Sequence, residues 1–368
     1  MKVAMLSDCY PPRTGGIESQ VGDLAARLRR AGHETEVFTA TPGAKGEHAG
    51  AIDVVGGVPV HRMALPPAVG VPVNPWAVPE VTRRLVEGGF DVAHVHVGVV
   101  SPFAWDTAGV ATRVGLPTAL TWHCLLDRTA PLQAPWVRRW VRRGAVLSAV
   151  SAVAAQGVAR AADGARVAVL PNGIDPLDWP VGPVRGASRP VRLVAVTRLA
   201  PRKRVLGLLD VVARARGRLG EGAFSLEVLG GGPLEPLLRS RIRALGLEGT
   251  VVLRGRVERA VVARMHREAD GFVSATRLEA FGIAALEART AGLPVIARAD
   301  SGTADVVTHG VSGLLAGDDD GLVDALVRFV ADRTLRDRLA RHNVSTPPAQ
   351  TWDRVIGQVL AEYGRAGA

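Results

Sequence analysis

The sequence contains few residues of the kinds that build disulfide scaffolds or membrane spans. Only two cysteines, Cys9 and Cys124, occur in 368 residues, which excludes a disulfide framework and favours a reducing cytosol. Aromatic residues make up 4% of the chain, so aliphatic side chains must fill its cores. No uninterrupted apolar run approaches the ~18 residues of a membrane-spanning helix, and the run after Lys2 is too short for a secretory signal peptide. We therefore expect a cytoplasmic protein.

Charged residues of both signs are present, but they are unevenly distributed. Residues 1–180 carry 17 Lys and Arg against 15 Asp and Glu, a net charge of +2, whereas residues 181–368 carry 28 against 20, a net charge of +8. Such an excess of positive charge favours phosphate-bearing partners. Because no basic stripe interleaved with aromatics, zinc-finger spacing or helix-turn-helix signature accompanies it, we expect no nucleic-acid partner.

Apolar runs alternate with segments of helical periodicity along the whole chain. A strand at Lys2–Leu6, a helix at Ile17–Ala31 and a strand at Glu34–Ala40 form a βαβ unit, and the second half repeats this plan from Val191 onward. The alternation predicts an α/β fold of two doubly wound, Rossmann-like domains with mostly parallel sheets, facing each other across a cleft. In such sheets ligands bind beyond the carboxyl ends of the strands.

A segment rich in proline and glycine, Asp175–Pro190, separates the two halves and is typical of a linker. We therefore place the first domain at residues 1–180 and the second at residues 181–351. The functional residues should lie in the loops that follow the strands of each domain.

Three of these loops contain residues suited to phosphate. Gly15 and Gly16 precede a helix whose backbone N–H groups and dipole favour an anion; a simple glycine turn is the alternative. Arg198 and Lys203 flank a proline turn and can hold a diphosphate, the guanidinium through two hydrogen bonds and the ammonium as a point charge. The alternative, a solvated charge cluster, is commoner. The Gly230–Pro233 run suits either phosphate or a tight turn, and it lacks the dinucleotide fingerprint.

Two carboxylates, Glu279 and Glu287, bracket an apolar segment after the predicted strand Gly271–Ala275. If a helix begins near Phe281, Glu279 lies beside the free N–H groups of its first turn, and Glu287 leans back toward that end. Carboxylates accept hydrogen bonds from vicinal hydroxyls, whereas backbone donors hold phosphate oxygens. The segment therefore predicts a site for a polyhydroxylated ligand, with a capping acid plus a surface glutamate as the alternative.

The histidines and the remaining acids carry weaker signals. His123 closes a predicted strand and suits a hydrogen-bond donor, a base or a ligand, although a lone histidine is more often structural. His94 and His96 point to one face of a strand, but no third metal ligand accompanies them. The segment Asp318–Asp320 precedes a helix, where acids usually act as caps. We therefore expect neither a metal nor a cofactor.

In order and spacing these motifs together resemble the family 4 retaining glycosyltransferases, which have the GT-B architecture. The resemblance covers nearly the whole chain and includes Gly15–Gly16, Pro171–Asp175, Arg198 with Lys203, Gly230–Pro233, and Glu279 with Glu287. Members transfer a sugar from a nucleotide-diphosphate donor to an acceptor hydroxyl with retention, generally without a divalent metal. The resemblance thus implies a bacterial enzyme of glycan, glycolipid or natural-product assembly, whose last helix, about residues 352–368, crosses back to the first domain.

The resemblance also implies a role for each matching residue. Arg198 and Lys203 would hold the diphosphate and stabilise the leaving group in place of a metal ion. Glu279 would bind the hydroxyls of the transferred sugar and Glu287 those of the ribose, whereas His123 would lie near the reacting carbon. The other implied donor-site positions are Gly15, Gly16, Asn172, Gly231, Phe281, Gly282 and Ile283.

GDP-mannose and UDP-sugars both fit this donor site, and neither the acceptor nor the oligomeric state is indicated. Because no enzymic nucleophile is evident, we favour a front-face displacement in which the leaving phosphate helps to remove the acceptor's proton. A non-hydrolysing sugar-nucleotide epimerase on the same fold is an alternative, and a non-catalytic sugar-nucleotide-binding protein is a more distant one. A Rossmann-type oxidoreductase is disfavoured by the absence of G-x-G-x-x-G.

The segment Ala134–Arg143 bears on the location of the acceptor. Trp136 and Trp140 lie four residues apart, with four arginines around them, as in amphipathic surfaces that touch anionic lipid at the inner face of a membrane. Phosphatidylinositol mannosyltransferases of the family use basic surfaces on this domain. We favour the alternative, in which the Trp face packs on the sheet and the arginines are solvated.

Overall fold

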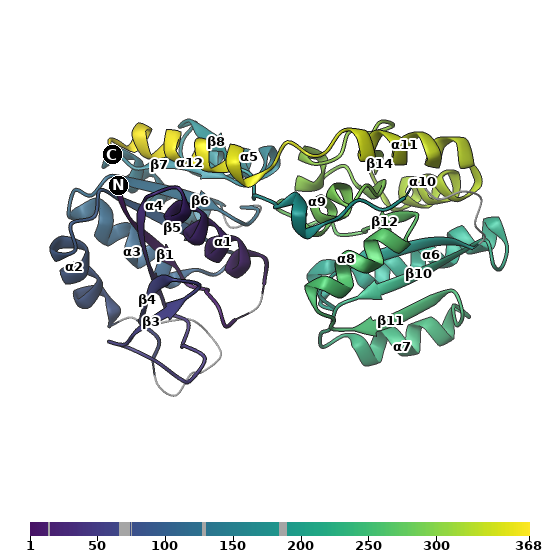
Figure 1. The fold of residues 1–368 in the computed structure, drawn as a ribbon, viewed down its shortest axis with the longest axis horizontal. Helices are drawn as coiled ribbons and strands as arrows, with labels where there is room; N and C mark the ends of the chain where they lie inside the picture. The colour runs from purple at the N-terminus through teal and green to yellow at the C-terminus, as the bar shows by residue number, and fades with distance from the viewer. Residues whose placement is uncertain (14, 66–73, 75, 127–129, 184–189) are drawn as a thin grey trace. The chain divides into compact units, whose positions relative to one another are not determined.

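A computed structural model describes residues 1–13, 15–65, 74, 76–126, 130–183 and 190–368 (Figure 1). The chain divides into two units, one of Met1–Gly173 with Trp352–Ala368 and one of Ile174–Thr351. The first unit therefore ends at Gly173, before the boundary predicted at residue 180. The last helix, α12 (Trp352–Ala366), coloured yellow in Figure 1, belongs to the first unit.

The first unit is built on a sheet that, in the described residues, has eight strands in the order β3-β4-β2-β1-β5-β6-β7-β8, and only β3 and β4 of these pair antiparallel. Its strands are β1 (Lys2–Ser7), β2 (Glu34–Thr39), β3 (Ile52–Val55), β4 (Val58–Arg62), β5 (Val92–Val97), β6 (Thr118–Trp122), β7 (Val146–Ala149) and β8 (Val167–Val169). Its helices, besides α12, are α1 (Gly16–Arg30), α2 (Ala77–Glu87), α3 (Pro102–Arg113), α4 (Ala130–Arg142) and α5 (Ala152–Ala161).

The central strands β1 and β5 are buried on both faces of this sheet. Successive side chains of a strand point to opposite faces, so each face has its own core cluster. In β1, Ala4 and Leu6 join a core cluster with residues of α2, α3, α4 and α5. Val3 and Met5 join a second cluster with residues of α1 and α12, among them Val359. The C-terminal helix thus completes the core of the first unit.

The hairpin of β3 and β4 was absent from the predicted elements. Its two-residue turn, Gly56–Gly57, has φ of 58° and 79°, and positive φ at both positions is typical of the turns that join tightly paired antiparallel strands. A Gly-Gly pair between two apolar runs is therefore the signal that would have found this hairpin.

The second unit is built on a six-stranded parallel sheet in the order β11-β10-β9-β12-β13-β14. Its strands are β9 (Val191–Val196), β10 (Phe224–Leu229), β11 (Val251–Gly255), β12 (Gly271–Val273), β13 (Val295–Arg298) and β14 (Gly313–Ala316). Its helices are α6 (Val205–Leu219), α7 (Glu235–Ala244), α8 (Arg259–Glu268), α9 (Ile283–Thr290), α10 (Asp319–Ala331) and α11 (Arg333–Ser345). Within the described ranges, no helix of either unit has the length and apolarity needed to cross a membrane.

Candidate functional site

The carboxyl edge of the sheet in the second unit brings together Lys203 and Glu279, which are 76 residues apart in sequence. Lys203 ends the short 3-10 helix after β9, and Glu279 lies in the loop between β12 and α9. The Lys203 Nζ lies 2.6 Å from the Glu279 Oε2, and their side chains are 30% and 23% exposed. An ammonium and a carboxylate therefore lie side by side, within reach of a ligand at the strand ends.

The loop that carries Glu279 is held by backbone contacts. The N–H of Gly302 donates to the carbonyl of Glu279 at 2.8 Å. Gly282 has a φ of 90°, and a Cβ there would lie only 2.6 Å from the Thr303 Oγ1. Only glycine satisfies both the left-handed backbone and this close approach.

The predicted helix start near Phe281 is wrong, because α9 begins at Ile283 with the left-handed Gly282 as its N-cap. The phenyl ring of Phe281 is buried in the second unit. The first-turn N–H groups are therefore those of Ile283 and Ala284, one to two residues later than expected.

Glu287 lies in the second turn of α9 and is half-buried, so it is not the surface glutamate of the alternative interpretation. Burial raises the pKa of its carboxyl to about 7, and the charge of Arg259 only partly opposes this effect. Near pH 7 the carboxyl is therefore present in both its protonated and its ionised form, and hydroxyl groups that donate to it would favour the ionised form.

Arg198 lies exposed in the loop that follows β9. Among the described residues, none forms an ion pair or hydrogen bond with its guanidinium, whereas Lys203 in the same loop contacts Glu279. The guanidinium is therefore available to an anionic ligand.

The glycines of the Gly230–Pro233 run allow two loops to pack tightly. A Cβ on Gly230 would lie 1.9 Å from the carbonyl oxygen of Thr197, and one on Gly232 would lie 2.5 Å from that of Leu199. The carbonyl of Gly231 accepts a hydrogen bond from the N–H of Leu199 at 3.1 Å. The tight-turn interpretation thus explains Gly230 and Gly232, and it places Gly231 against the loop of Arg198.

In the first unit, Gly15 is the N-cap of α1 and Gly16 its first residue. The carboxylate of Glu18 lies at this helix start, since a Cβ on Gly15 would lie 2.3 Å from its Oε2. Glu18 also forms an ion pair with Arg13 at 3.2 Å. A phosphate bound here would therefore compete with an acid that belongs to the protein.

His123 and Asn172 line one small cavity of the first unit together with His94 and His96. The cavity offers about 20 Å³ to the centre of a water molecule, and an ordered water needs roughly 10–15 Å³. The Nε2 of His123 lies 3.0 Å from the Nδ1 of His96, and burial lowers the pKa of His123 to about 4. His123 is thus a neutral, hydrogen-bonded imidazole at pH 7. The parts of the chain that the structure covers contain no cluster of three His, Cys, Asp or Glu suited to a metal ion.

The predicted amphipathic segment forms α4, and its two tryptophans differ. Trp140 is buried and meets Trp105 edge-on. Trp136 also contacts Trp105 but is 50% exposed, and the neighbouring Leu132 is 71% exposed. Packing of the Trp face on the core therefore accounts for Trp140 only.

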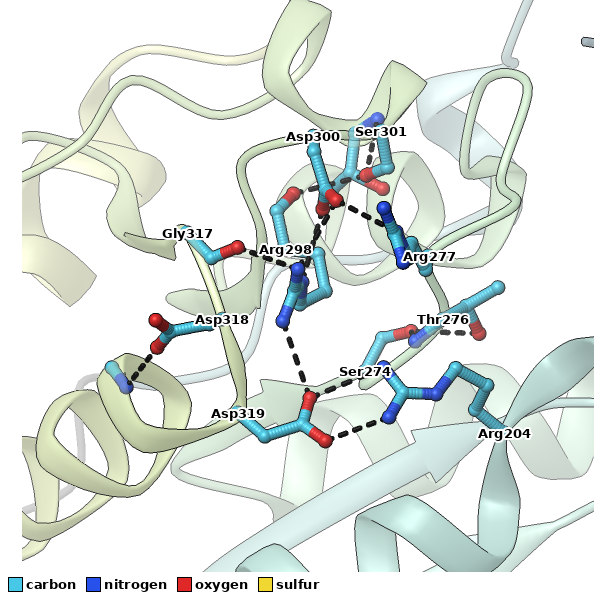
Figure 2. Close-up of polar contacts among 12 residues, drawn as sticks. Arg204, Ser274, Thr276, Arg277, Arg298, Asp300, Ser301, Gly317, Asp318 and Asp319 are labelled. Atoms are coloured by element: carbon cyan, nitrogen blue, oxygen red, sulfur yellow. Dashed lines mark hydrogen bonds and ion pairs between the residues drawn. The ribbon is translucent and has the colours of Figure 1, made fainter. Parts of the chain in front are cut away.

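Sequence analysis missed a second polar cluster at the edge that carries Lys203, which we call the arginine–aspartate network (Figure 2). It consists of Arg204, Arg277, Arg298, Asp300 and Asp319. The capping role predicted for the acids before α10 is confirmed for one of them, Asp318, which accepts from the N–H of Gly321. Arg298 is the last residue of β13, and the other members lie in segments that follow strands. That position is the one signal in the sequence that could have found the network.

Two protein-family models match this chain over most of its length. The model described as Glycosyltransferase Family 4 matches residues 14–177, and the model described as Glycosyl transferases group 1 matches residues 186–344. A D-inositol 3-phosphate glycosyltransferase of Xylanimonas cellulosilytica is 30% identical over 99% of this chain and 97% of its own. A GDP-mannose-dependent alpha-(1-6)-phosphatidylinositol monomannoside mannosyltransferase of Mycobacterium tuberculosis is 29% identical over 99% and 98%.

Solved structures of the same architecture resemble the whole chain. The Anabaena protein HepE in complex with UDP and glucose superposes with a TM-score of 0.74 at 20% identity, covering 98% of both chains. The sucrose-phosphate synthase of Thermosynechococcus elongatus superposes with a TM-score of 0.76 at 18% identity, covering 99% of this chain and 98% of its own. These likenesses confirm the fold class, a pair of Rossmann-like α/β domains of the GT-B type.

Proposed function

Because this chain belongs to the family 4 glycosyltransferases, we propose that it transfers a hexosyl or N-acetylhexosaminyl group from a nucleotide-diphosphate sugar to an acceptor hydroxyl, with retention. The observation that carries the proposal is the pairing of Lys203 with Glu279 at the strand ends of the second unit. The similar HepE structure contains UDP and glucose, and the mycobacterial relative is named as GDP-mannose-dependent. Both names support a nucleotide-sugar donor and leave its base open.

In this proposal two cations bind the donor diphosphate without a metal ion. Arg198 has a guanidinium that no described residue engages, and Lys203 presents a half-buried ammonium. A guanidinium binds two phosphate oxygens at once, and an ammonium acts as a point charge. Preorganised cations of this kind stabilise the negative charge that develops on a departing diphosphate.

The two glutamates would bind the hydroxyl groups of the donor. Glu279, which lies 2.6 Å from the Lys203 ammonium, would accept hydrogen bonds from hydroxyls of the sugar next to the diphosphate. Glu287, one helix turn into α9, would accept from the ribose. The roles predicted for Gly15, Gly16, His123 and Asn172 stay predictions.

The proposed displacement proceeds on the front face of the sugar. The bond between the anomeric carbon and the phosphate oxygen breaks, the acceptor oxygen bonds to that carbon from the same face, and the acceptor's proton passes to the leaving phosphate. Lys203 and Arg198 would hold the phosphate while it takes this proton. A covalent glycosyl–enzyme trapped on a carboxylate of this chain would contradict the mechanism.

A thermal-shift panel of UDP, GDP and ADP tests the donor site directly. A ligand at 100 times its Kd stabilises the folded state by about 2.7 kcal/mol, which corresponds to roughly 5–10 °C in Tm for a domain of this size. We expect one base to give such a shift with the wild type and a much smaller one with the Lys203→Ala variant. Equal, small shifts for all three nucleotides in both proteins would contradict a nucleotide-sugar donor.

For the acceptor side, we propose that α4 contacts an anionic membrane surface through its exposed Trp136 and the arginines around it. Each arginine near an anionic surface contributes about 1 kcal/mol, so neutralising four should weaken binding to phosphatidylserine vesicles by up to about 1,000-fold.

The variant that tests this contact replaces Arg138, Arg139, Arg142 and Arg143 with glutamine. A matched control replaces the four exposed arginines of α10 and α11, which are Arg328, Arg333, Arg338 and Arg341. Vesicle binding that is salt-independent, or equally reduced in the control, would refute the contact.

A further inference from the structure

The residue after Lys203 has an unusual backbone conformation. Arg204 has φ 50° and ψ 37°, the left-handed region that residues with a side chain seldom adopt, because their Cβ crowds the carbonyl oxygen. Arg204 is both the C-cap of the 3-10 helix that ends at Lys203 and the N-cap of α6. The unfavourable backbone conformation of Arg204 therefore helps to set the direction in which the Lys203 side chain points.

The side chain of Arg204 is held by a bidentate ion pair. Its Nη1 and Nη2 donate to the two carboxylate oxygens of Asp319 at 3.1 and 2.6 Å. Two parallel hydrogen bonds restrict both the position and the orientation of a guanidinium. Asp319 lies in the first turn of α10, so the pair connects the loop after β9 to the loop after β14 (Figure 2).

Asp319 is itself fixed by a buried cation. Arg298, at the end of β13, is only 5% exposed, and its Nη1 donates to Asp319 at 3.2 Å. Its Nε and Nη2 donate to the carboxylate of Asp300 at 3.0 and 3.1 Å, and Arg277 donates to the same carboxylate at 3.1 Å. A buried guanidinium is costly to leave unpaired, so these acceptors are bound firmly.

The pKa shifts of Arg298 and Asp300 agree with this close pairing. The hydrogen bonds that Arg298 donates to Asp300 raise the pKa of Arg298, so the guanidinium stays charged. Burial would raise the pKa of Asp300, but the hydrogen bond and charge of Arg298 outweigh it, and the pKa is lowered. Arg298 and Asp300 thus each favour the charged form of the other.

A second contact reaches Lys203 from the loop after β12. The hydroxyl of Thr276 donates to the backbone carbonyl of Lys203 at 3.2 Å, and the Ser274 hydroxyl lies 3.2 Å from that of Thr276. The loops after β9, β12, β13 and β14 are therefore tied together around one residue whose ammonium meets Glu279.

We propose that the arginine–aspartate network positions Lys203 for sugar transfer. Asp319, anchored by Arg298, holds Arg204 in the left-handed conformation, and that conformation keeps the Lys203 ammonium against Glu279. Arg204, Asp319 and Arg298 are positioning residues, and none of them needs to touch the donor. The inference rests on the proposed role of Lys203 in binding the donor diphosphate.

The left-handed backbone makes the proposal testable by rescue. Glycine adopts this conformation without strain, so Arg204→Gly should keep the loop in place without the ion pair. We expect Asp319→Ala to lower kcat about tenfold, and Arg204→Gly to remain within about threefold of the wild type. The double variant Asp319→Ala/Arg204→Gly should recover to the level of Arg204→Gly. A residue that only stabilises the fold would not show this recovery, because both variants with Asp319→Ala lose the same ion pair and the same contact to Arg298.

The matched control is Asp320→Ala. Asp320 also lies in the first turn of α10 and pairs with Arg214 of α6 at 2.7 Å, so its removal breaks an ion pair between the same two helices without touching Arg204. We expect an unchanged kcat. Circular dichroism and Tm identify any variant that fails to fold, in which case Asp319→Asn replaces Asp319→Ala and the same recovery is expected.

The outcomes separate this inference from the proposed function. The positioning role is wrong, and the donor-site proposal stands, if Lys203→Ala lowers kcat but Asp319→Ala does not. The same holds if adding Arg204→Gly fails to restore the kcat of the Asp319→Ala variant. If Lys203→Ala leaves kcat unchanged, the donor-site proposal itself is wrong.

Discussion

Replacing Lys203 with alanine is expected to lower kcat by about 100- to 1,000-fold, the range found when one preorganised electrostatic contact to a transition state is removed. The ammonium lies 2.6 Å from Glu279 at the carboxyl edge of the sheet, and in the proposed reaction it neutralises the departing diphosphate. Steady-state kinetics with a nucleotide-sugar donor, or hydrolysis of the donor where no acceptor is known, measures the effect. KM for the donor should rise less than kcat falls, because the leaving group's charge is greatest in the transition state.

The neighbouring cation Arg202 provides the control. It is exposed on the same 3-10 helix, so Arg202→Ala removes the same charge from the same loop without removing the contact to Glu279. We expect its kcat within a factor of two to three of the wild type. Glu279→Gln should lower kcat as Lys203→Ala does, since it breaks the same pair and weakens the acceptor for the sugar hydroxyls. Similar losses of kcat for Arg202→Ala and Lys203→Ala would mean that catalysis depends on the net charge of the loop and not on the position of Lys203.

Glu287→Gln is expected to change the pH dependence of stability. Burial raises the pKa of Glu287 from 4.5 to about 7 in the folded protein, so the folded state binds the proton more tightly than the unfolded chain. The stability that this proton contributes is fully present below about pH 4.5 and is lost as the pH rises through 7. Glutamine does not titrate. Between pH 4.5 and 8, the free energy of unfolding of the variant should therefore improve by up to about 3 kcal/mol relative to the wild type.

Urea unfolding of both proteins at pH 5 and pH 8 measures this difference. Because all other groups titrate in both proteins, the comparison isolates Glu287. If the carboxylate also accepts hydrogen bonds from the ribose, nucleotide binding must release its proton, and affinity should fall roughly tenfold between pH 8 and pH 6 in the wild type relative to Glu287→Gln. A difference in stability that does not vary with pH would show that Glu287 titrates normally in the folded state.

Strand positions in this chain follow closely from local sequence. The predicted strand Lys2–Leu6 matches β1 (Lys2–Ser7) to within one residue, because a continuous apolar run buried on both sides is distinctive of a parallel sheet. The start of α9 was misplaced by two residues. Its N-cap is the left-handed Gly282, where a Cβ would clash with Thr303, a residue about 20 positions later in the chain. The hairpin of β3 and β4 was missed although its turn is a local signal.

The candidate site was predictable in part for the same reason. Lys203 and Glu279 each follow a strand, and parallel strands end at a common edge, so the sequence predicts that both residues lie at that edge. The ion pairs of Arg298 were not predictable, because an arginine at the end of an apolar strand resembles any solvated charge until its acceptors are placed. Asp319 illustrates the same limit, as one of three consecutive acids that all suit a helix cap.

The order of residues by itself therefore determined the two α/β units, the loops that carry charge and the family to which the chain belongs, because periodicity and strand-end position are local properties. Only the tertiary structure decided which charges meet. It brings Lys203 beside Glu279 and pairs Asp319 with the left-handed Arg204. It also buries Glu287 enough to raise the pKa of its carboxyl to about 7. The physical reason is that these pairings depend on distances in space between residues that are 76 and 115 positions apart in sequence, which spacing along the chain does not encode.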